Sequence, residues 1–180
     1  MRVTLLDAID DPDLRERILG GLAAAGLSGP VRILTRERLA PCVGCFRCWV
    51  AHPGTCRARD AGNDILDAMM GSDAVVWLTR PRFGCWDPVA KGMLDKSIGL
   101  VSPFFTTVEG ETHHRARYAD TPRLIALALP AGDTDEGDRA RFELLVARNG
   151  VNLHDRGATV HWIYDPAHPP THDLVHDLRS

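Results

Sequence analysis

The run AVVWLT, residues 74–79, is the stretch of this chain that decides its fold. It is apolar at nearly every position, so neither side of the segment is suited to water. A strand with two apolar faces is typical of the centre of a parallel sheet, where helices cover both sides. A run this short, bounded by turn residues, has the length of a strand and not of a helix. We therefore predict a central buried strand at 74–79.

Other short apolar runs alternate with segments of helical periodicity. The predicted strands are Arg2–Leu6, Val31–Leu34, Ala74–Thr79, Arg123–Leu129 and Ala158–Ile163, and the predicted helices are Asp11–Ala25, Asp60–Met70, Pro88–Ile98 and Asp135–Asn149, the last ending at Gly150. Strands that alternate with helices need crossover connections and form a parallel sheet. The predicted fold class is α/β, a doubly wound five-stranded parallel sheet whose strands, numbered along the chain, lie in the order 2-1-3-4-5.

Length and composition predict one domain over residues 1–180, since 180 residues with 44% hydrophobic composition can form a substantial core. Residues 166–180 are rich in His and Pro and are predicted to form a loose C-terminal tail. We expect no membrane segment, because no apolar run is long enough. We expect no nucleic-acid partner either, because the net charge is −3 and the basic residues are scattered.

Four of the five cysteines, Cys42, Cys45, Cys48 and Cys56, lie close together in the pattern C-x2-C-x2-C-x7-C. Thiolates at this spacing can converge on one centre, and the sequence predicts them as ligands of a [4Fe–4S] cluster or, less often, zinc. The alternative is a set of free thiols in a packed loop, which the spacing leaves open. Clustered cysteines, odd in number, favour a reducing cytoplasm over a secreted disulfide framework.

A series of short motifs follows in a fixed order. They are PCVGCFRCW (41–49), Gly54-x-Cys56 with Asp60, the strand AVVWLT, Arg82-Phe83-Gly84, Lys91 with Leu94-Asp95-Lys96, and Ser102-Pro103-Phe104-Phe105, followed by Arg141–Asn149 and Asn152-Leu153-His154. In this order they resemble the flavodoxin-like family of NAD(P)H-dependent FMN reductases and iron–sulfur flavoproteins. The resemblance implies a flavodoxin-like fold with FMN along the carboxyl edge of the sheet and NAD(P)H as co-substrate. It also implies a homodimer or higher homo-oligomer and a small-molecule or protein electron acceptor.

The same resemblance implies which residues contact the flavin. The loop after the third strand would lie against the ring through Thr79, Arg80, Pro81, Arg82, Phe83, Gly84, Cys85 and Trp86, and the loop after the fourth would close over it through Pro130, Ala131 and Gly132. No side chain is implied as a catalytic acid or base, because the flavin carries the electron chemistry. The implied function is an FMN-dependent NAD(P)H oxidoreductase or electron-transfer flavoprotein. A cluster at the cysteines would exchange electrons with the flavin across the crevice.

The turn after the first strand departs from this family's pattern. Such proteins hold the phosphate with a turn rich in Ser, Thr, Gly and Asn, whose N–H groups and helix dipole attract an anion. This chain has DAIDDPDL at residues 7–14, with four aspartates and a proline that lacks an N–H. Arg15 or Arg17 could offset part of the repulsion. The acidic turn suits a well-capped helix and predicts weakened FMN binding. The alternative function is therefore a flavodoxin-fold protein that has lost FMN and acts as a non-catalytic binding or scaffold subunit.

Overall fold

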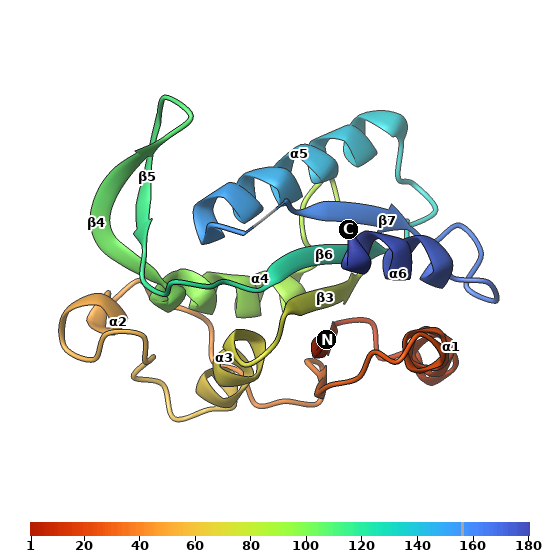
Figure 1. The fold of residues 1–180 in the computed structure, drawn as a ribbon, viewed down its shortest axis with the longest axis horizontal. Helices are drawn as coiled ribbons and strands as arrows, with labels where there is room; N and C mark the ends of the chain where they lie inside the picture. Colours follow the sequence, from red (N-terminus) through yellow and green to blue (C-terminus); the bar gives the residue numbers. More distant parts are fainter. Residues whose placement is uncertain (156) are drawn as a thin grey trace.

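A five-stranded parallel sheet forms the centre of the structure, a computed structural model in which residues 1–155 and 157–180 are described (Figure 1). Its strands are β1 (Val3–Asp7), β2 (Val31–Ile33), β3 (Ala74–Thr79), β6 (Arg123–Ala128) and β7 (Thr159–Trp162), in the order β2-β1-β3-β6-β7. Every residue of β3 is buried, as predicted for AVVWLT. The predicted order 2-1-3-4-5 is confirmed, since β6 and β7 are the predicted fourth and fifth strands, and the fold is flavodoxin-like.

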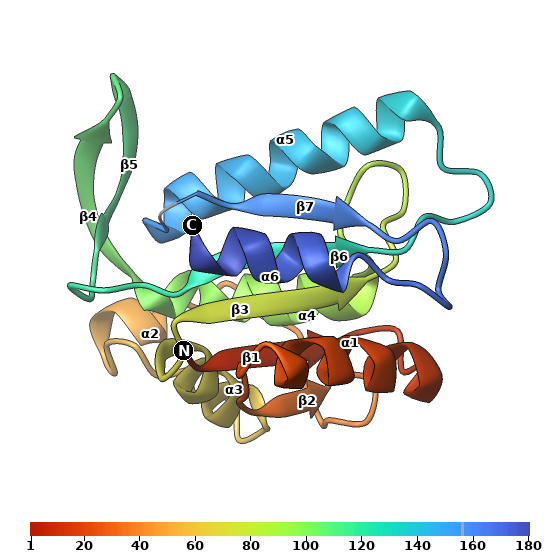
Figure 2. The same ribbon diagram turned by 45° about the vertical axis from the view of Figure 1, so that its right-hand side comes forward.

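Helices cover both faces of this sheet (Figure 2). One face packs against α1 (Pro12–Ala24) and α6 (Thr171–Arg179), and the other against α3 (Gly62–Met70), α4 (Pro88–Lys96) and α5 (Glu136–Leu153). Apolar strand residues therefore alternate between two cores, with Leu5 facing α1 and Leu6 facing α3. In the described part of the chain, none of the helices has the length and apolar character needed to cross a bilayer.

The C-terminal segment is a packed helix, so the prediction of a loose tail over 166–180 is corrected for residues 171–179. Leu174 and Leu178 of α6 are buried in the core that α1 shares. The guanidinium of Arg179 also donates a hydrogen bond of 2.6 Å to the carbonyl of Ala25, at the end of α1. Two leucines one helical turn apart place one face of this helix in the core, although residues 166–180 as a whole are rich in His and Pro.

Helix α5 also runs further than predicted, because Gly150 does not end it. The helix continues to Leu153, and His154 closes it in a left-handed conformation with φ of 58°. A Cβ at Gly150 would lie 2.5 Å from the Cβ of Ala158, just before β7. The glycine therefore serves close packing of α5 against the chain entering β7.

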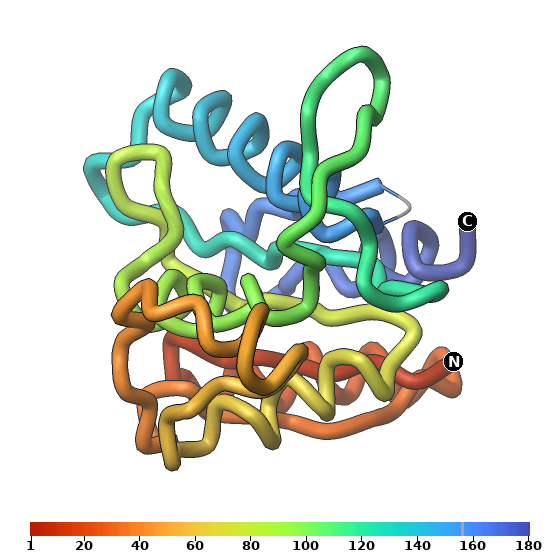
Figure 3. The backbone as a smooth tube through the Cα atoms, turned by 90° about the vertical axis from the view of Figure 1, so that its left-hand side faces the viewer, coloured from red at the N-terminus to blue at the C-terminus, as the bar shows by residue number. Residues whose placement is uncertain are grey.

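A β-hairpin between α4 and β6 was not predicted. It follows a short 3-10 turn, η1 (Ser97–Leu100), and consists of β4 (Val101–Val108) and β5 (Glu111–Ala116). Glu109 and Gly110 both have positive φ, as a tight two-residue hairpin turn requires. Figure 3 shows this hairpin rising from the body of the molecule beside one end of α5.

Candidate functional site

Three loops meet at the carboxyl edge of the sheet, toward which the strand arrows point in Figure 2. They follow β1 (residues 8–11), β3 (residues 80–87) and β6 (residues 129–135). In a doubly wound sheet, the connections from two neighbouring strands leave in opposite directions at one point, and ligands bind in the crevice there. In the strand order β2-β1-β3-β6-β7, that point lies between β1 and β3. The candidate site is therefore built from these three loops.

The loop after β1 is closed by the carboxylate of Asp7, the last residue of the strand. Its Oδ1 accepts hydrogen bonds of 2.9 Å from the backbone N–H groups of both Ile9 and Asp10. Its Oδ2 accepts a bond of 2.6 Å from the guanidinium of Arg15, which makes an ion pair. The Asp7 side chain is fully buried. The N–H groups of this turn therefore point at a carboxylate of the protein itself.

A second carboxylate, that of Asp10, links the same turn to the end of β2. It accepts a bond of 2.8 Å from Arg36 and one of 3.2 Å from the hydroxyl of Thr35. The hydrogen bond from Arg36 is the main reason that the pKa of Asp10 is lowered. Asp10 has φ of 59°, a conformation that Asp and Asn adopt more readily than most residues.

The helix that follows is capped from within, as the acidic sequence predicted. The Oδ1 of Asp11 accepts the N–H of Leu14 at 3.0 Å, and Pro12 occupies the first turn, where its missing N–H costs nothing. Two arginines could offset the charge of a phosphate at this turn. Arg15 forms an ion pair with Asp7, and Arg17 is exposed.

The loop after β3 is a tight turn that carries an exposed aromatic ring. Arg82 and Cys85 exchange two backbone hydrogen bonds of 2.9 and 2.8 Å. Between them, Phe83 and Gly84 have φ of 53° and 70°. The Phe83 side chain is 83% exposed at the tip. Gly84 packs so closely on α5 that a Cβ there would lie 2.7 Å from the Cβ of Arg141.

The base of this loop is held by a buried polar pair. The hydroxyl of Thr79 donates a hydrogen bond to the carboxylate of Asp87. The other oxygen of Asp87 accepts the N–H groups of Val89 and Ala90 at 2.8 and 3.0 Å, which caps α4. Thr79 therefore fixes the direction in which the loop leaves the strand, and its side chain is not open to a ligand.

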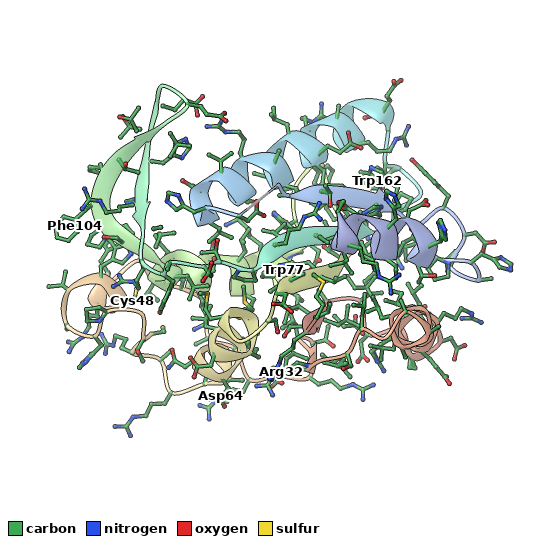
Figure 4. All side chains as sticks on the ribbon, viewed as in Figure 1. Arg32, Cys48, Asp64, Trp77, Phe104 and Trp162 are labelled. Carbon is green, nitrogen blue, oxygen red and sulfur yellow. The ribbon has the colours of Figure 1, made fainter. Side chains whose placement is uncertain are left out.

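Trp86 belongs to the core. Its ring lies 5.5 Å from that of Trp77 and 5.0 Å from that of Phe142, and its indole N–H donates to the Oδ1 of Asn149 at 2.9 Å. Figure 4 shows Trp77, its neighbour in this cluster, in the middle of the sheet. The side chain of Trp86 is only 4% exposed, so it is not available to stack on a flavin.

The loop after β6 lies beside the loop after β3. The guanidinium of Arg82 is 3.7 Å from the carboxylate of Asp133, which connects the two loops. Ala131 and Thr134 hydrogen-bond each other, and Gly132 is exposed with open space around it. Of the predicted flavin contacts, the structure leaves Arg80, Arg82, Phe83, Cys85, Pro130 and Gly132 at least partly exposed, and buries Thr79, Pro81, Gly84, Trp86 and Ala131.

The four clustered cysteines line a separate cavity of about 340 Å³, together with Lys96 and Ile98. Helix α2 (Arg47–Val50) carries Cys48, and burial, followed by the nearby thiol of Cys56, raises the pKa of the Cys48 thiol. The donor set suits an iron–sulfur cluster or zinc. However, across residues 1–155 and 157–180 no three His, Cys, Asp or Glu side chains are arranged to hold a metal ion. The structure thus brings the four cysteines to one cavity, but their side chains are not arranged to bind one metal ion.

A buried ion pair forms part of the wall of this cavity. The ammonium of Lys96 lies 3.0 Å from the carboxylate of Asp60, with the two side chains 1% and 3% exposed. It also lies 3.9 Å from the sulfur of Cys56. Burial raises the pKa of Asp60, but hydrogen bonds from the N–H groups of Ala40 and Gly62 and from Lys96 outweigh it, so the pKa is lowered.

Helix α4 runs from the loop after β3 to Lys96 in the wall of the cysteine cavity. Pro88 begins this nine-residue helix next to the loop after β3, and Lys96 at its far end contacts the cavity. At 1.5 Å per residue, the helix separates the two places by about 13 Å. Figure 4 likewise shows Cys48 near the hairpin end of the molecule. Pro41, which lines the cysteine cavity, also lines a second cavity with Pro88 at the start of α4, so the cysteine loop extends along this helix toward the carboxyl edge.

Comparison with known proteins supports the fold. No family model and no curated protein sequence matches the chain. Among solved structures, an NAD(P)H:quinone oxidoreductase from Methanothermobacter marburgensis superposes with a TM-score of 0.66 at 14% identity, covering 99% of this chain and 95% of that one. An azoreductase from Bacillus anthracis str. Sterne gives 0.64 at 16%, with 99% and 92% covered. An FMN-dependent NADH-azoreductase from Bacillus anthracis str. Ames Ancestor, in complex with FMN, gives 0.61 at 10%, with 99% and 97% covered. Identities this low show a common fold and nothing more.

The residues at this edge fit one end of an FMN molecule and not the other. The two loops after β3 and β6 leave an exposed ring, Phe83, and a half-exposed guanidinium, Arg82, where a flavin ring could be bound. At the β1 turn, the N–H groups that a phosphate requires are occupied by Asp7. The phosphate end of FMN therefore does not fit this structure.

Three features of the site escaped the sequence analysis. The cap that Asp87 makes on α4 could have been found, because Asp followed by Pro is a common helix start. The hydrogen bond from Trp86 to Asn149 joins residues far apart in the chain, and no local pattern signals it. The inward direction of the Asp7 carboxylate depends on the shape of the turn, which composition does not reveal.

Proposed function

We propose that this protein is an oxidoreductase that uses NAD(P)H and a flavin at the carboxyl edge of its sheet. The observation that carries the proposal is the superposition of nearly the whole chain on structures named NAD(P)H:quinone oxidoreductase and azoreductase. The exposed loops after β3 and β6 agree with it, since they lie where ligands bind in doubly wound sheets. Because the phosphate end does not fit, we propose the flavin as an added ligand and assign no chemical step to it.

Arg82 is the side chain that we propose to orient the flavin or the electron acceptor. Its guanidinium is 51% exposed, and among residues 1–155 and 157–180 the carboxylate that it faces is that of Asp133, at 3.7 Å. A guanidinium offers forked N–H donors that suit carbonyl or carboxylate oxygens. Phe83, next to it at the tip of the turn, offers an apolar face for stacking.

This function can be tested by following NAD(P)H oxidation in the presence of a quinone or an azo dye, with and without added flavin. We expect turnover only when flavin is present. Arg82→Ala should lower kcat/KM about 10- to 100-fold, since a hydrogen bond from a charged group contributes about 1.5–3 kcal/mol. The matched control is Arg59→Ala, an exposed arginine of the cysteine loop, which should leave the rate unchanged. No oxidation of NADH or NADPH with any flavin and acceptor would contradict the proposal.

The alternative is a flavodoxin-fold protein that has lost its cofactor and serves as a non-catalytic binding or scaffold subunit. The closed β1 turn is the observation in its favour. The structures reported above are all named as reductases, which favours the enzyme. The NAD(P)H oxidation assay, run with each flavin in turn, separates the two functions. A scaffold subunit would oxidise neither NADH nor NADPH.

We also propose that two copies of the chain associate through the hairpin. Phe104 and Phe105 of β4 are 67% and 65% exposed, and Figure 4 shows Phe104 on the outer side of the hairpin. Leu100 and Val101, which precede these rings in the chain, are buried and are not available for such a contact. Exposed aromatic rings of this size are common anchors of protein interfaces.

The variant Phe104→Asp is expected to weaken association by at least about tenfold, because burying an unpaired charge at an interface costs several kcal/mol. Light scattering coupled to size-exclusion chromatography across a concentration series measures this. Tyr164→Asp is the matched control, since that ring is 70% exposed but lies in the loop after β7. If the protein is monomeric at every concentration, or if both variants behave alike, the hairpin is not the interface.

A third proposal concerns the cysteine cavity, which we propose to hold an iron–sulfur cluster after rearrangement of the surrounding loop. Its support is the gathering of Cys42, Cys45, Cys48 and Cys56 around one space. The ammonium of Lys96, 3.9 Å from the sulfur of Cys56, places a positive charge beside this space. Zinc is the alternative metal for these thiols. Unpaired thiols in such numbers suit a reducing cytoplasm, which we propose as the compartment of this protein.

Protein purified without oxygen is expected to contain iron and inorganic sulfide, with a broad brown absorption. Cys48→Ser should abolish the colour, because a cluster needs its thiolate ligands. Cys85→Ser should keep it, since Cys85 is exposed on the loop after β3 and outside the cavity. Colourless protein with stoichiometric zinc would replace the cluster by zinc, and protein free of both metals would remove the metal centre altogether.

A further inference from the structure

Three backbone N–H groups of the β1–α1 turn donate hydrogen bonds to carboxylates of the protein itself. The carboxylate of Asp7 accepts hydrogen bonds from the N–H groups of Ile9 and Asp10, and that of Asp11 accepts one from the N–H of Leu14. Pro12 has no N–H to give. A phosphate bound at the start of a helix depends on these same backbone groups. In this chain a phosphate could reach the N–H groups of Ile9 and Asp10 only by displacing the buried carboxylate of Asp7.

Two of the four aspartates in the turn already have arginine partners. Arg15 pairs with Asp7 at 2.6 Å, and Arg36 pairs with Asp10 at 2.8 Å. A phosphate monoester would add a charge of about −1.5 to −2 beside these two carboxylates. If it displaced Asp7 from Arg15, the freed carboxylate would remain next to the anion. Both hydrogen bonding and charge therefore oppose a phosphate here.

A hydroxyl group at the same place is opposed neither by the occupied N–H groups nor by the negative charge of the aspartates. It is neutral, and it can donate a hydrogen bond to a carboxylate that keeps its own partners. Asp10 offers such a carboxylate, since its side chain is 23% exposed whereas that of Asp7 is fully buried. A ribityl chain that ends in a hydroxyl therefore suits the turn as it stands.

We propose, on the basis of the function proposed above, that this site selects a flavin without a phosphate, riboflavin rather than FMN. Asp7 is the residue that excludes the phosphate, and Asp10 is the residue that accepts the terminal hydroxyl. The selectivity is thus set at the far end of the ligand from the flavin ring, which the loops after β3 and β6 bind.

Equilibrium titrations of the full-length protein with riboflavin and with FMN test this, using flavin fluorescence and calorimetry. We expect riboflavin to bind the unaltered protein at least about tenfold more tightly than FMN. Asp7→Ser frees two N–H groups and Arg15, so FMN should bind about tenfold or more tightly than before, while riboflavin changes little. Asp10→Asn removes a charge and keeps a residue that tolerates positive φ, so FMN should gain and riboflavin should lose affinity.

The matched control is Asp13→Asn, which removes one negative charge from the exposed first turn of α1. It should alter neither affinity by more than about twofold, because exposed charges are strongly screened. Asp10→Asn keeps the test decisive if Asp7→Ser does not fold. FMN binding as tightly as riboflavin to the unaltered protein overturns the proposal. If neither flavin binds at about 1 mM, corresponding to a free energy weaker than about −4 kcal/mol, the proposed function itself fails.

Discussion

Phe142→Ala is expected to lower the free energy of unfolding by about 3–5 kcal/mol, the usual loss when a buried aromatic ring is truncated. Phe142 is fully buried on α5, and its ring lies edge-on to Trp86 at 5.0 Å and to Trp162 at 5.8 Å. The ring therefore joins α5 to the loop after β3 and to the edge strand β7. Its loss leaves a cavity that rigid neighbouring rings cannot fill.

Chemical denaturation followed by tryptophan fluorescence measures this change, and a fall in melting temperature of roughly 10 °C should accompany it. Phe83→Ala is the matched control, because it removes the same ring from a site that is 83% exposed, and it should change stability by less than about 0.5 kcal/mol. The loop after β3 should also lose protection from hydrogen exchange in Phe142→Ala. Equal stabilities for the two variants would show that the aromatic cluster does not support the loop.

Lys96→Met should be nearly as damaging, with a loss of about 3–5 kcal/mol, because it leaves the carboxylate of Asp60 buried without its partner. Lys91→Met is the comparison, since Lys91 and Asp95 form an exposed pair on the same helix, worth at most about 0.5 kcal/mol. The double variant Lys96→Met with Asp60→Asn should recover part of the loss, because it removes both charges.

The same pair gives a pH dependence with a definite sign. The pKa of Asp60 is lowered in the folded protein, so the unfolded chain takes up a proton first as the pH falls. The stability that Asp60 contributes is therefore complete above about pH 4, the ordinary range of an aspartate, and is lost as the pH falls further. Unfolding measured from pH 6 to pH 3 should show a steeper loss in the unaltered protein than in the double variant. Parallel curves would contradict this account of the pair.

The sheet could be predicted from the sequence because its strands are continuous apolar runs. AVVWLT allows no exposed face, and the alternation with helices leaves few topologies, so the strand order followed. The hairpin of β4 and β5 could not be found in the same way. Its strands lie outside the main sheet, carry exposed Phe and Thr, and include His and Arg, so they lack the signal of burial.

The candidate site was less predictable, because the sequence does not show which way a loop side chain points. A tryptophan in a loop can face a ligand or the core, and only the distant rings of Trp77 and Phe142 decide that Trp86 faces the core. The spacing of the cysteines predicts that they gather, which they do, but it does not fix where their sulfur atoms point. The acidic turn predicted poor phosphate binding, and the structure adds the cause, a carboxylate that takes the turn's own donors.

Amide chemical-shift mapping with riboflavin tests most directly whether a flavin binds at this edge while the β1 turn stays closed. The account predicts the largest shifts in the loops after β3 and β6, at Phe83 and Gly132, a smaller shift at Asp10, which accepts the terminal hydroxyl, and an Ile9 amide that is still bonded to Asp7 and shifted little. A large shift at Ile9, as the turn opens to the ligand, or shifts confined to the cysteine cavity would contradict it.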